Sequence, residues 1–184
     1  HVIAFDPADP KKMWCGHDGG LSYTTDITTV SDSGTDFPWV DKNRGYNVTQ
    51  FYTVTMHDEA GNNQLMGGTQ DNGTPFFIMT TTTTASTDIS TGDGAYAYFG
   101  NSFAYTSSQL GRVLRLSYYG NGNPQIASNW SDITPSNAIN QLFINPFTVD
   151  PSNEDYMYYM TQTAVWRNNQ LNDLPMYLNG TTTG

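Results

Sequence analysis

Apolar and polar residues alternate along this chain in short runs that turn residues separate. Residues 21–24 alternate apolar and polar, as a half-buried strand does. Residues 1–5 are rich in β-branched and aromatic side chains, and the prolines and acids of residues 6–10 end this run in a turn. In no segment do apolar residues recur at helical spacing over three turns, so helix signals are nearly absent. The pattern predicts an all-β fold.

The expected strands group into four units of strand and turn. In the first unit they cover residues 1–5, 12–16, 21–24 and 37–40. In the second they cover residues 50–56, 64–68 and 75–79, with a polar outer strand or loop over 80–91. In the third they cover residues 95–99, 102–106 and 112–118, and in the fourth 142–144, 147–149, 156–160 and 164–167.

This repetition is typical of a β-propeller. Strand-rich units with a period of roughly 40 to 50 residues form propeller blades, because one blade cannot bury both of its faces alone. We therefore expect a β-propeller segment of about three and a half to four four-stranded blades. Their approximate bounds are residues 1–47, 48–92, 93–135 and 136–184.

Glycine and acidic residues occur together in three turns. These turns cover residues 16–20, 67–74 and 92–94, and each adjoins a short aromatic or β-branched run. Their recurrence indicates one strand-turn-strand unit that is repeated, rather than a single active site built once.

Composition limits the kinds of partner. The chain has 17 acidic and 7 basic residues and a formal net charge of −10, which repels phosphate backbones, so nucleic acid is not an expected partner. Only 13% of the residues are charged, and a surface rich in Thr, Asn, Ser, Gly and Gln indicates an extracellular or cell-surface protein. No apolar run approaches the roughly 20 residues that span a bilayer, so membrane insertion is not expected. The single cysteine, Cys15, excludes an internal disulfide.

These motifs resemble those of secreted β-propellers with bacterial-neuraminidase-type (Asp-box) repeats, including the sortilin-like and xyloglucan-hydrolase-like branches. The resemblance rests on residues 4–7, 14–20, 50–52, 67–74, 92–94 and 149–151. The Asp-box itself is degenerate, since residues 24–26 begin one and Trp39 ends one, with an insertion that contains residues 31–34 between them. The resemblance implies a secreted protein whose propeller closes with six or more blades.

The chain has too few blades for such a ring. We expect it to be part of a longer protein, or to be completed by copies of itself or by another chain. An open half-propeller would expose two blade faces and a strand edge. His1 begins inside an expected strand and residues 179–184 contain no closing strand, which favours a fragment whose remaining blades are its partners.

Three aspartates are candidates for catalysis. Asp18, Asp71 and Asp93 each lie in a glycine-rich turn, from which a side chain could reach a central cleft. A glycoside hydrolase needs two carboxyl groups about 5 to 10 Å apart, one of which acts as an acid. In the alternative interpretation, each aspartate binds the backbone of its own turn. The resemblance to xyloglucan hydrolases implies that the two acids come from different propellers, so this chain would hold half of that machinery.

Aromatic residues form a second candidate site. They make up 14% of the chain, and their flat faces can stack on sugar rings or anchor a protein partner. Alternatively, at least half of these rings face the core between blades. The expected binding residues combine tyrosines with the polar turn and are Tyr46, Tyr52, Gln70, Asp71, Asn72, Tyr96 and Tyr98.

No cofactor is expected from the sequence. Asp32, Asp36 and Asp41, or Asp88 and Asp93, could place oxygen ligands around Ca²⁺, but the chain has no twelve-residue calcium loop between helices. The three histidines share no zinc-ligand spacing with one another or with the single cysteine.

The sequence leaves three functions open. The first is a secreted, non-catalytic β-propeller segment that binds a protein or a polysaccharide. The second is a fragment of a glycoside hydrolase acting on a β-glucan such as xyloglucan, and the third is a structural subunit of an extracellular assembly. Propellers serve all three roles, so the fold alone does not decide between them.

Overall fold

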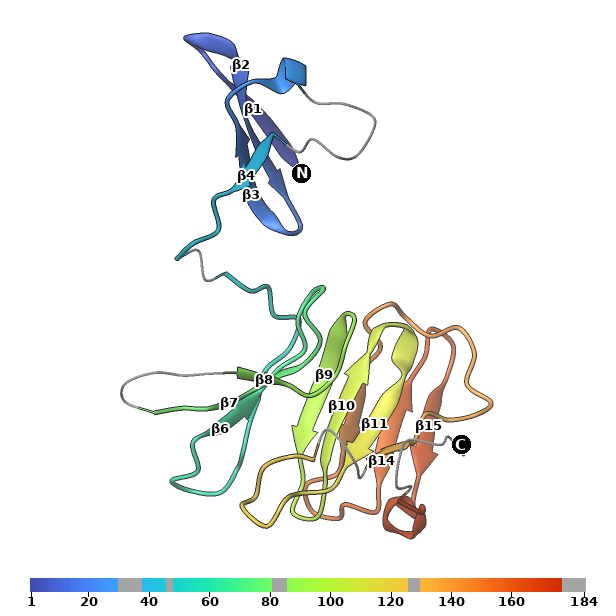
Figure 1. Ribbon diagram of the computed structural model, residues 1–184. Coiled ribbons are helices and arrows are strands. Elements are labelled where there is room, and N and C mark those ends of the chain that lie inside the picture. The colour runs from blue at the N-terminus through green and yellow to red at the C-terminus, as the bar shows by residue number, and fades with distance from the viewer. Residues whose placement is uncertain (30–37, 46–47, 81–85, 126–129, 177–184) are drawn as a thin grey trace. The chain divides into compact units, whose positions relative to one another are not determined.

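The computed structural model describes residues 1–29, 38–45, 48–80, 86–125 and 130–176 (Figure 1). The chain forms two compact units, His1–Val48 and Thr49–Gly184. Within the described residues, the regular structure consists of antiparallel sheets and three short 3₁₀ turns. The predicted all-β fold is confirmed. The described part of the chain contains no helix with the length and hydropathy that crossing a bilayer requires.

The first unit is one four-stranded sheet in which strands that are neighbours in sequence pair. Its strands are β1 (Val2–Asp6), β2 (Asp9–His17), β3 (Gly20–Thr24) and β4 (Trp39–Asp41), and the 3₁₀ turn η1 (Ile27–Thr29) follows β3. The carboxylates of Asp6 and Asp9 accept the backbone N–H groups of Ala8 and Lys11, at 2.8 and 3.2 Å. The two acids thus stabilise the β1–β2 turn that the sequence predicts.

The second unit contains three sheets, each a meander of antiparallel strands. The first sheet is formed by β5 (Thr55–Met56), β6 (Gln64–Met66), β7 (Pro75–Ile78) and β8 (Ser86–Asp88). The second is formed by β9 (Gly94–Phe99), β10 (Ala104–Ser108), β11 (Val113–Leu116) and β12 (Trp130–Asp132). The third is formed by β13 (Phe147–Val149), β14 (Met157–Met160) and β15 (Val165–Asn168). The 3₁₀ turns of this unit are η2 (Gln109–Gly111) and η3 (Leu171–Asp173).

Two expected strands differ in the structure. The strand predicted over residues 50–56 is reduced to β5 and a single bridge between Phe51 and Thr69. The strand predicted over residues 142–144 is absent from these described residues, where the Asn145 side chain accepts the backbone N–H of Leu142 at 2.9 Å. A local side-chain acceptor here replaces the backbone partner that a strand would use.

The outer strands β12 and β4 also differ from the expected strands. Strand β12 was not predicted, because it has only three residues and their apolar alternation is too short to identify. Phe37, at the start of the outer strand expected in the first unit, lies outside the described residues, and β4 begins at Trp39.

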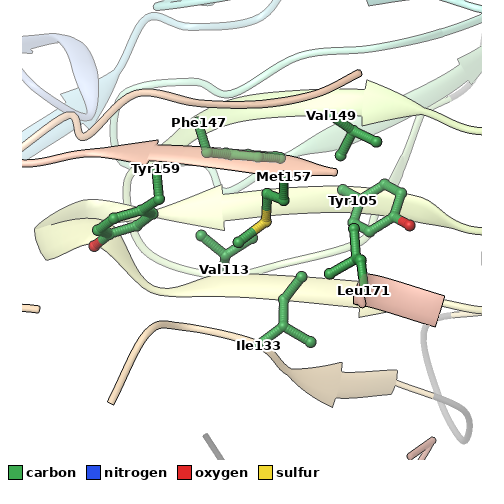
Figure 2. Close-up of a cluster of buried hydrophobic side chains, with 8 residues drawn as sticks. All are labelled: Tyr105, Val113, Ile133, Phe147, Val149, Met157, Tyr159 and Leu171. Atoms are coloured by element: carbon green, nitrogen blue, oxygen red, sulfur yellow. The ribbon is translucent and has the colours of Figure 1, made fainter. Parts of the chain in front are cut away.

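The three sheets of the second unit pack through two hydrophobic clusters. The cluster between the β5–β8 and β9–β12 sheets consists of Met66, Phe76, Ile89, Phe99 and Ala104. The cluster between the β9–β12 and β13–β15 sheets consists of Tyr105, Val113, Ile133, Phe147, Val149, Met157, Tyr159 and Leu171 (Figure 2). The β9–β12 sheet therefore has side chains buried on both of its faces, as a blade between two other blades does.

Alternation along β14 shows how the sequence specifies this packing. Met157 and Tyr159 are 2% and 0% exposed, whereas Met160 is 47% exposed. Successive side chains of a strand point to opposite faces, so the buried pair faces β9–β12 and its neighbours face away.

Two tyrosines in the larger cluster allow the effect of a hydrogen-bonded hydroxyl on stability to be compared with that of an unpaired one. Tyr159 donates its hydroxyl proton to the Gly111 carbonyl at 2.9 Å, whereas the Tyr105 hydroxyl is buried and has no partner among the described residues. We expect Tyr159→Phe to lower the free energy of unfolding by about 1 kcal/mol, and Tyr105→Phe to leave it unchanged or raise it by up to about 1 kcal/mol. Urea denaturation of both variants checks this, and equal losses would contradict it.

Candidate functional site

The turns of the second unit are joined to the connections between its sheets. In an antiparallel meander, the turn after the second strand lies at the same end as the connection that enters the first strand. The N–H of Gly73, in the β6–β7 turn, donates at 2.7 Å to the carbonyl of Gly92, in the connection to β9. The N–H of Leu110, in the β10–β11 turn, donates at 2.9 Å to the carbonyl of Phe143, in the connection to β13. Each of these turns is thus fixed against the chain that leads into the next sheet.

A Ser/Thr-Gln pair after the second strand fixes the start of each sheet of the second unit. These pairs are Thr69-Gln70, Ser108-Gln109 and Thr161-Gln162; a fourth pair, Thr49-Gln50, precedes the first of these sheets. Each glutamine N–H donates to a carbonyl that precedes the first strand of its own sheet. The acceptors are Gln50, Asp93 and Asn140, at 3.0, 2.9 and 3.0 Å respectively.

The β6–β7 turn brings a group of polar residues to the start of β9, and we call this group the turn cluster. Its members are Tyr52, Gln70, Asp71, Asn72, Asp93 and Gln109. The N–H of Asp71 donates to Oδ1 of Asp93 at 3.2 Å, across 22 residues of sequence. The N–H of Asp93 donates in turn to Oε1 of Gln109 at 3.0 Å. Two of the three glycine-and-acid turns therefore meet in one site.

Two glycines allow this close approach. A Cβ atom on Gly68 would lie 2.0 Å from the carbonyl oxygen of Ala95, and one on Gly94 would lie 2.0 Å from the carbonyl oxygen of Gly73. Backbone atoms at these distances leave no room for any side chain. The glycines at positions 68 and 94 are required by the contact between the β6–β7 turn and β9.

The tip of the turn presents polar groups to solvent. Asp71 and Asn72 are exposed, and Asp71 has a left-handed φ of 61°, which Asp tolerates better than most residues. The Asn72 side-chain amide donates to the Gln70 carbonyl at 3.1 Å. The conformation of the turn is therefore held from within, while the Asp71 carboxylate remains exposed.

Tyr52 lies beside these acids. Its N–H donates to the Gly68 carbonyl at 2.8 Å, which holds residues 50–52 along the segment before the β6–β7 turn. Burial, followed by the negative charges of Asp93 and Asp71, raises the pKa of Tyr52 above its ordinary value. The Tyr52 hydroxyl is therefore protonated at neutral pH and can donate a hydrogen bond as well as accept one.

Three of the expected binding residues are not part of this cluster. Tyr96 and Tyr98, on β9, pack against the hydrophobic cluster between the β9–β12 and β13–β15 sheets, and the Tyr98 ring centroid lies 6.2 Å from that of Tyr105. The N–H of Tyr96 donates to Oγ of Ser107 at 2.9 Å. These two tyrosines support the core. Tyr46 lies outside the described residues.

Asp18 lies in the β2–β3 turn of the first unit. Its carboxylate pairs with Nε2 of His1 at 3.2 Å, and the side chain is 66% exposed. Asn43 stabilises this turn, because its side chain accepts the N–H of Leu21 at 2.7 Å and donates to the carbonyl of Gly19 at 2.9 Å.

The three candidate aspartates therefore do not play one repeated structural role. Asp18 and Asp71 follow the second strand of a sheet, whereas Asp93 lies in the connection between two sheets. Among the described residues, the Asp93 carboxylate stabilises the turn of Asp71 rather than its own, and that of Asp18 binds a histidine. The structure thus differs from the expectation that each acid binds the backbone of its own turn.

A serine, a histidine and an aspartate of the first unit are linked by hydrogen bonds, but the direction of these bonds does not allow nucleophilic catalysis. The N–H of Gly19 donates to Nδ1 of His17 at 3.0 Å, so the neutral ring carries its proton on Nε2. That Nε2 lies 2.9 Å from Oγ of Ser22, which donates to Oδ1 of Asp41 at 3.2 Å. A nucleophilic serine needs a base that takes its proton, whereas this histidine donates to the serine. The chain of hydrogen bonds is structural.

Within the described ranges, no group of three or more His, Cys, Asp or Glu side chains is placed to bind a metal ion. Of the calcium candidates, Asp32 and Asp36 lie outside the described residues. Asp41 accepts the hydroxyl of a buried serine, Asp88 is exposed on β8, and Asp93 holds the β6–β7 turn.

No protein-family model matches the sequence, and no curated protein matches it. Gln109 is the member of the turn cluster that the sequence analysis did not identify. The signal that could have found it is the repeated Ser/Thr-Gln pair, whose glutamine recurs in every sheet of the second unit.

Proposed function

We propose that this protein is a secreted, non-catalytic segment of a β-propeller of the Asp-box type, and that it binds a polysaccharide at the turn cluster. The observation that carries the proposal is the meeting of Tyr52, Asp71 and Asp93 beside the start of β9. The resemblance of the glycine-and-acid turns to those of secreted propellers supports an extracellular setting, in which further blades complete the ring.

The chemistry of the turn cluster favours a sugar over a protein partner. Its polar groups are the exposed Asp71 carboxylate and Asn72 amide and the hydroxyl of the half-buried Tyr52, which match the donors and acceptors of neighbouring sugar hydroxyl groups. Protein interfaces are instead centred on several buried aromatic or arginine anchors. The cluster contains one aromatic residue and no cation.

Binding without hydrolysis fits the roles of the two acids. Asp93 is half-buried, and its Oδ1 accepts the N–H of Asp71, so this carboxylate positions the turn. Of the two acids, only Asp71 is exposed. Glycoside hydrolysis requires two carboxyl groups that both face the glycosidic bond.

The test is calorimetric titration of the protein with xyloglucan and mixed-linkage β-glucan oligosaccharides. We expect Asp71→Asn to weaken binding about tenfold, the loss expected when one charge-assisted hydrogen bond becomes neutral. Asparagine also tolerates the left-handed backbone at this position, so the urea unfolding midpoint should not change. Incubation with the same oligosaccharides should release no new reducing ends.

Asp88→Asn is the matched control, because Asp88 is an exposed acid of the same sheet that lies outside the turn cluster. It should bind the oligosaccharides as the unmodified protein does. Equal affinity of the Asp71→Asn variant and the unmodified protein would overturn the assignment of the turn cluster. If the unmodified protein released new reducing ends and the Asp71→Asn variant did not, the turn cluster would be a hydrolytic site rather than a binding site.

A further inference from the structure

A cavity of about 320 Å³ lies beside the larger hydrophobic cluster. It is bounded by residues 133–137, which follow β12, and by strands β14 and β15. Its volume falls at the lower end of the range of small-ligand pockets, about 300 to 1,000 Å³.

The lining combines apolar and amide groups. Ile133, Met157, Leu174 and the rings of Tyr159 and Trp166 form the apolar part. The polar part includes Ser136, Asn137, Asn168 and Asn169.

The cavity lining contains no acidic residue among the described residues, and Arg167 is its one charged member. Trp166 and Asn168 are half-buried, whereas Val165 and Arg167 are exposed, so the Arg167 side chain lies on the other face of β15. There its guanidinium carbon lies 6.0 Å from the ring centroid of Tyr156. The cavity therefore suits an uncharged ligand.

Several polar groups at the cavity have no hydrogen-bond partner among the described residues. The indole Nε1 of Trp166 is buried and makes no hydrogen bond with the described residues, although an indole N–H can act only as a donor. The side chain of Asn137 is likewise unpaired in the described part of the chain, and residue 137 is exposed. By contrast, Oδ1 of Asn168 already accepts the N–H of Gln170 at 2.8 Å.

We propose that this cavity is a second binding site, separate from the turn cluster, for one neutral pyranose ring. A pyranose has an apolar face, which can lie against the half-buried ring of Trp166, and hydroxyl groups, which can pair with the exposed side chains of Ser136 and Asn137. The two sites share a ligand class but no residue. The second site can therefore be confirmed or excluded independently of the first.

The experiment follows the tryptophan indole N–H signals of the ¹⁵N-labelled full chain by NMR, during titration with methyl β-D-glucopyranoside to about 50 mM. The chain has four tryptophans, and the signal that is lost in Trp166→Phe identifies Trp166. We expect this signal to shift saturably and that of Trp130 to stay in place. Asn137→Ala should raise the apparent Kd about three- to tenfold, as the loss of one hydrogen bond does.

Asn101→Ala is the matched control, because Asn101 is exposed between β9 and β10 and does not line the cavity. It should leave the titration unchanged, and so should Asp71→Asn, which separates this site from the turn cluster. A Trp166 signal that does not move with methyl glucopyranoside or methyl galactopyranoside would mean a cavity that holds only water, and would overturn the proposal. An Asn137→Ala variant with unchanged Kd, or a shift abolished by Asp71→Asn, would overturn it as well.

Discussion

Replacing Gly94 with alanine is expected to lower the free energy of unfolding by about 3 kcal/mol or more. The new Cβ would lie 2.0 Å from the Gly73 carbonyl oxygen and 2.8 Å from Oγ1 of Thr74. Neither neighbour can move alone, because Thr74 is buried and its hydroxyl lies 2.7 Å from that of Thr106. The β6–β7 turn would have to leave β9, which breaks the 2.9 Å hydrogen bond from the Gly94 N–H to the Thr69 carbonyl.

The same displacement reaches the turn cluster. Asp93 immediately precedes Gly94, so the Asp71–Asp93 hydrogen bond would be lost and oligosaccharide binding at the turn cluster should fall with stability. Urea denaturation measures the first effect and calorimetric titration the second. Gly120→Ala is the control, because a Cβ there has no atom within 4 Å. A Gly94→Ala variant as stable as Gly120→Ala would show that the turn does not pack on β9 as described.

Local pattern was enough to predict the strands of the second unit that have one buried and one exposed face. The strand expected over residues 156–160 corresponds to β14, Met157–Met160, where buried and exposed side chains alternate. In such a strand, the alternation of apolar and polar residues indicates which face is buried. Local pattern was misleading over residues 142–144, where apolar residues lie in a connection whose backbone is satisfied by a side chain.

The candidate site could be predicted only in part, because its contacts join distant segments. The sequence identifies the turns that contain Asp71 and Asp93, but not that the second acid holds the turn of the first. The sequence predicts Tyr96 and Tyr98 in the site, because alternation cannot distinguish an exposed face from one that a third sheet covers. The Ser/Thr-Gln repeat is hard to detect in the sequence because its spacing is irregular: Gln70 to Gln109 is 39 residues and Gln109 to Gln162 is 53.

The burial of Arg115 could not be predicted from the sequence either. It lies in a strand that the sequence predicts, at a position where a charged residue would ordinarily face solvent, yet it is 0% exposed. Its guanidinium donates to the carbonyls of Leu171 and Leu174, and its central carbon lies 4.5 Å from the ring centroid of Phe103. The charge is buried because the β9–β12 sheet is covered on both faces, and it ties β11 to the η3 turn.

Replacing Arg115 with alanine is expected to lower the free energy of unfolding by about 3 to 5 kcal/mol. The truncation leaves a cavity in the core and removes the donors of two carbonyl groups, which then lack these partners. Burial lowers the pKa of Arg115, but arginine keeps its charge at neutral pH, so both hydrogen bonds are charge-assisted. Arg115→Lys should recover only part of the loss, since an ammonium group lacks the planar fork that reaches both carbonyls.

Arg112→Ala is the matched control for this prediction. Arg112 directly precedes β11, and its side chain is 49% exposed and pairs with Oδ2 of Asp132 at 2.9 Å. The Arg112 end of this ion pair is exposed but the Asp132 side chain is only 12% exposed, so we expect Arg112→Ala to cost about 1 to 2 kcal/mol. Urea denaturation should therefore separate the two variants clearly, and limited proteolysis should cut near Leu171 earlier in Arg115→Ala. If Arg115→Ala were as stable as the unmodified protein, the cost of burying the guanidinium would equal its gain from the two carbonyls, and η3 would be held by the packing of Leu171 alone.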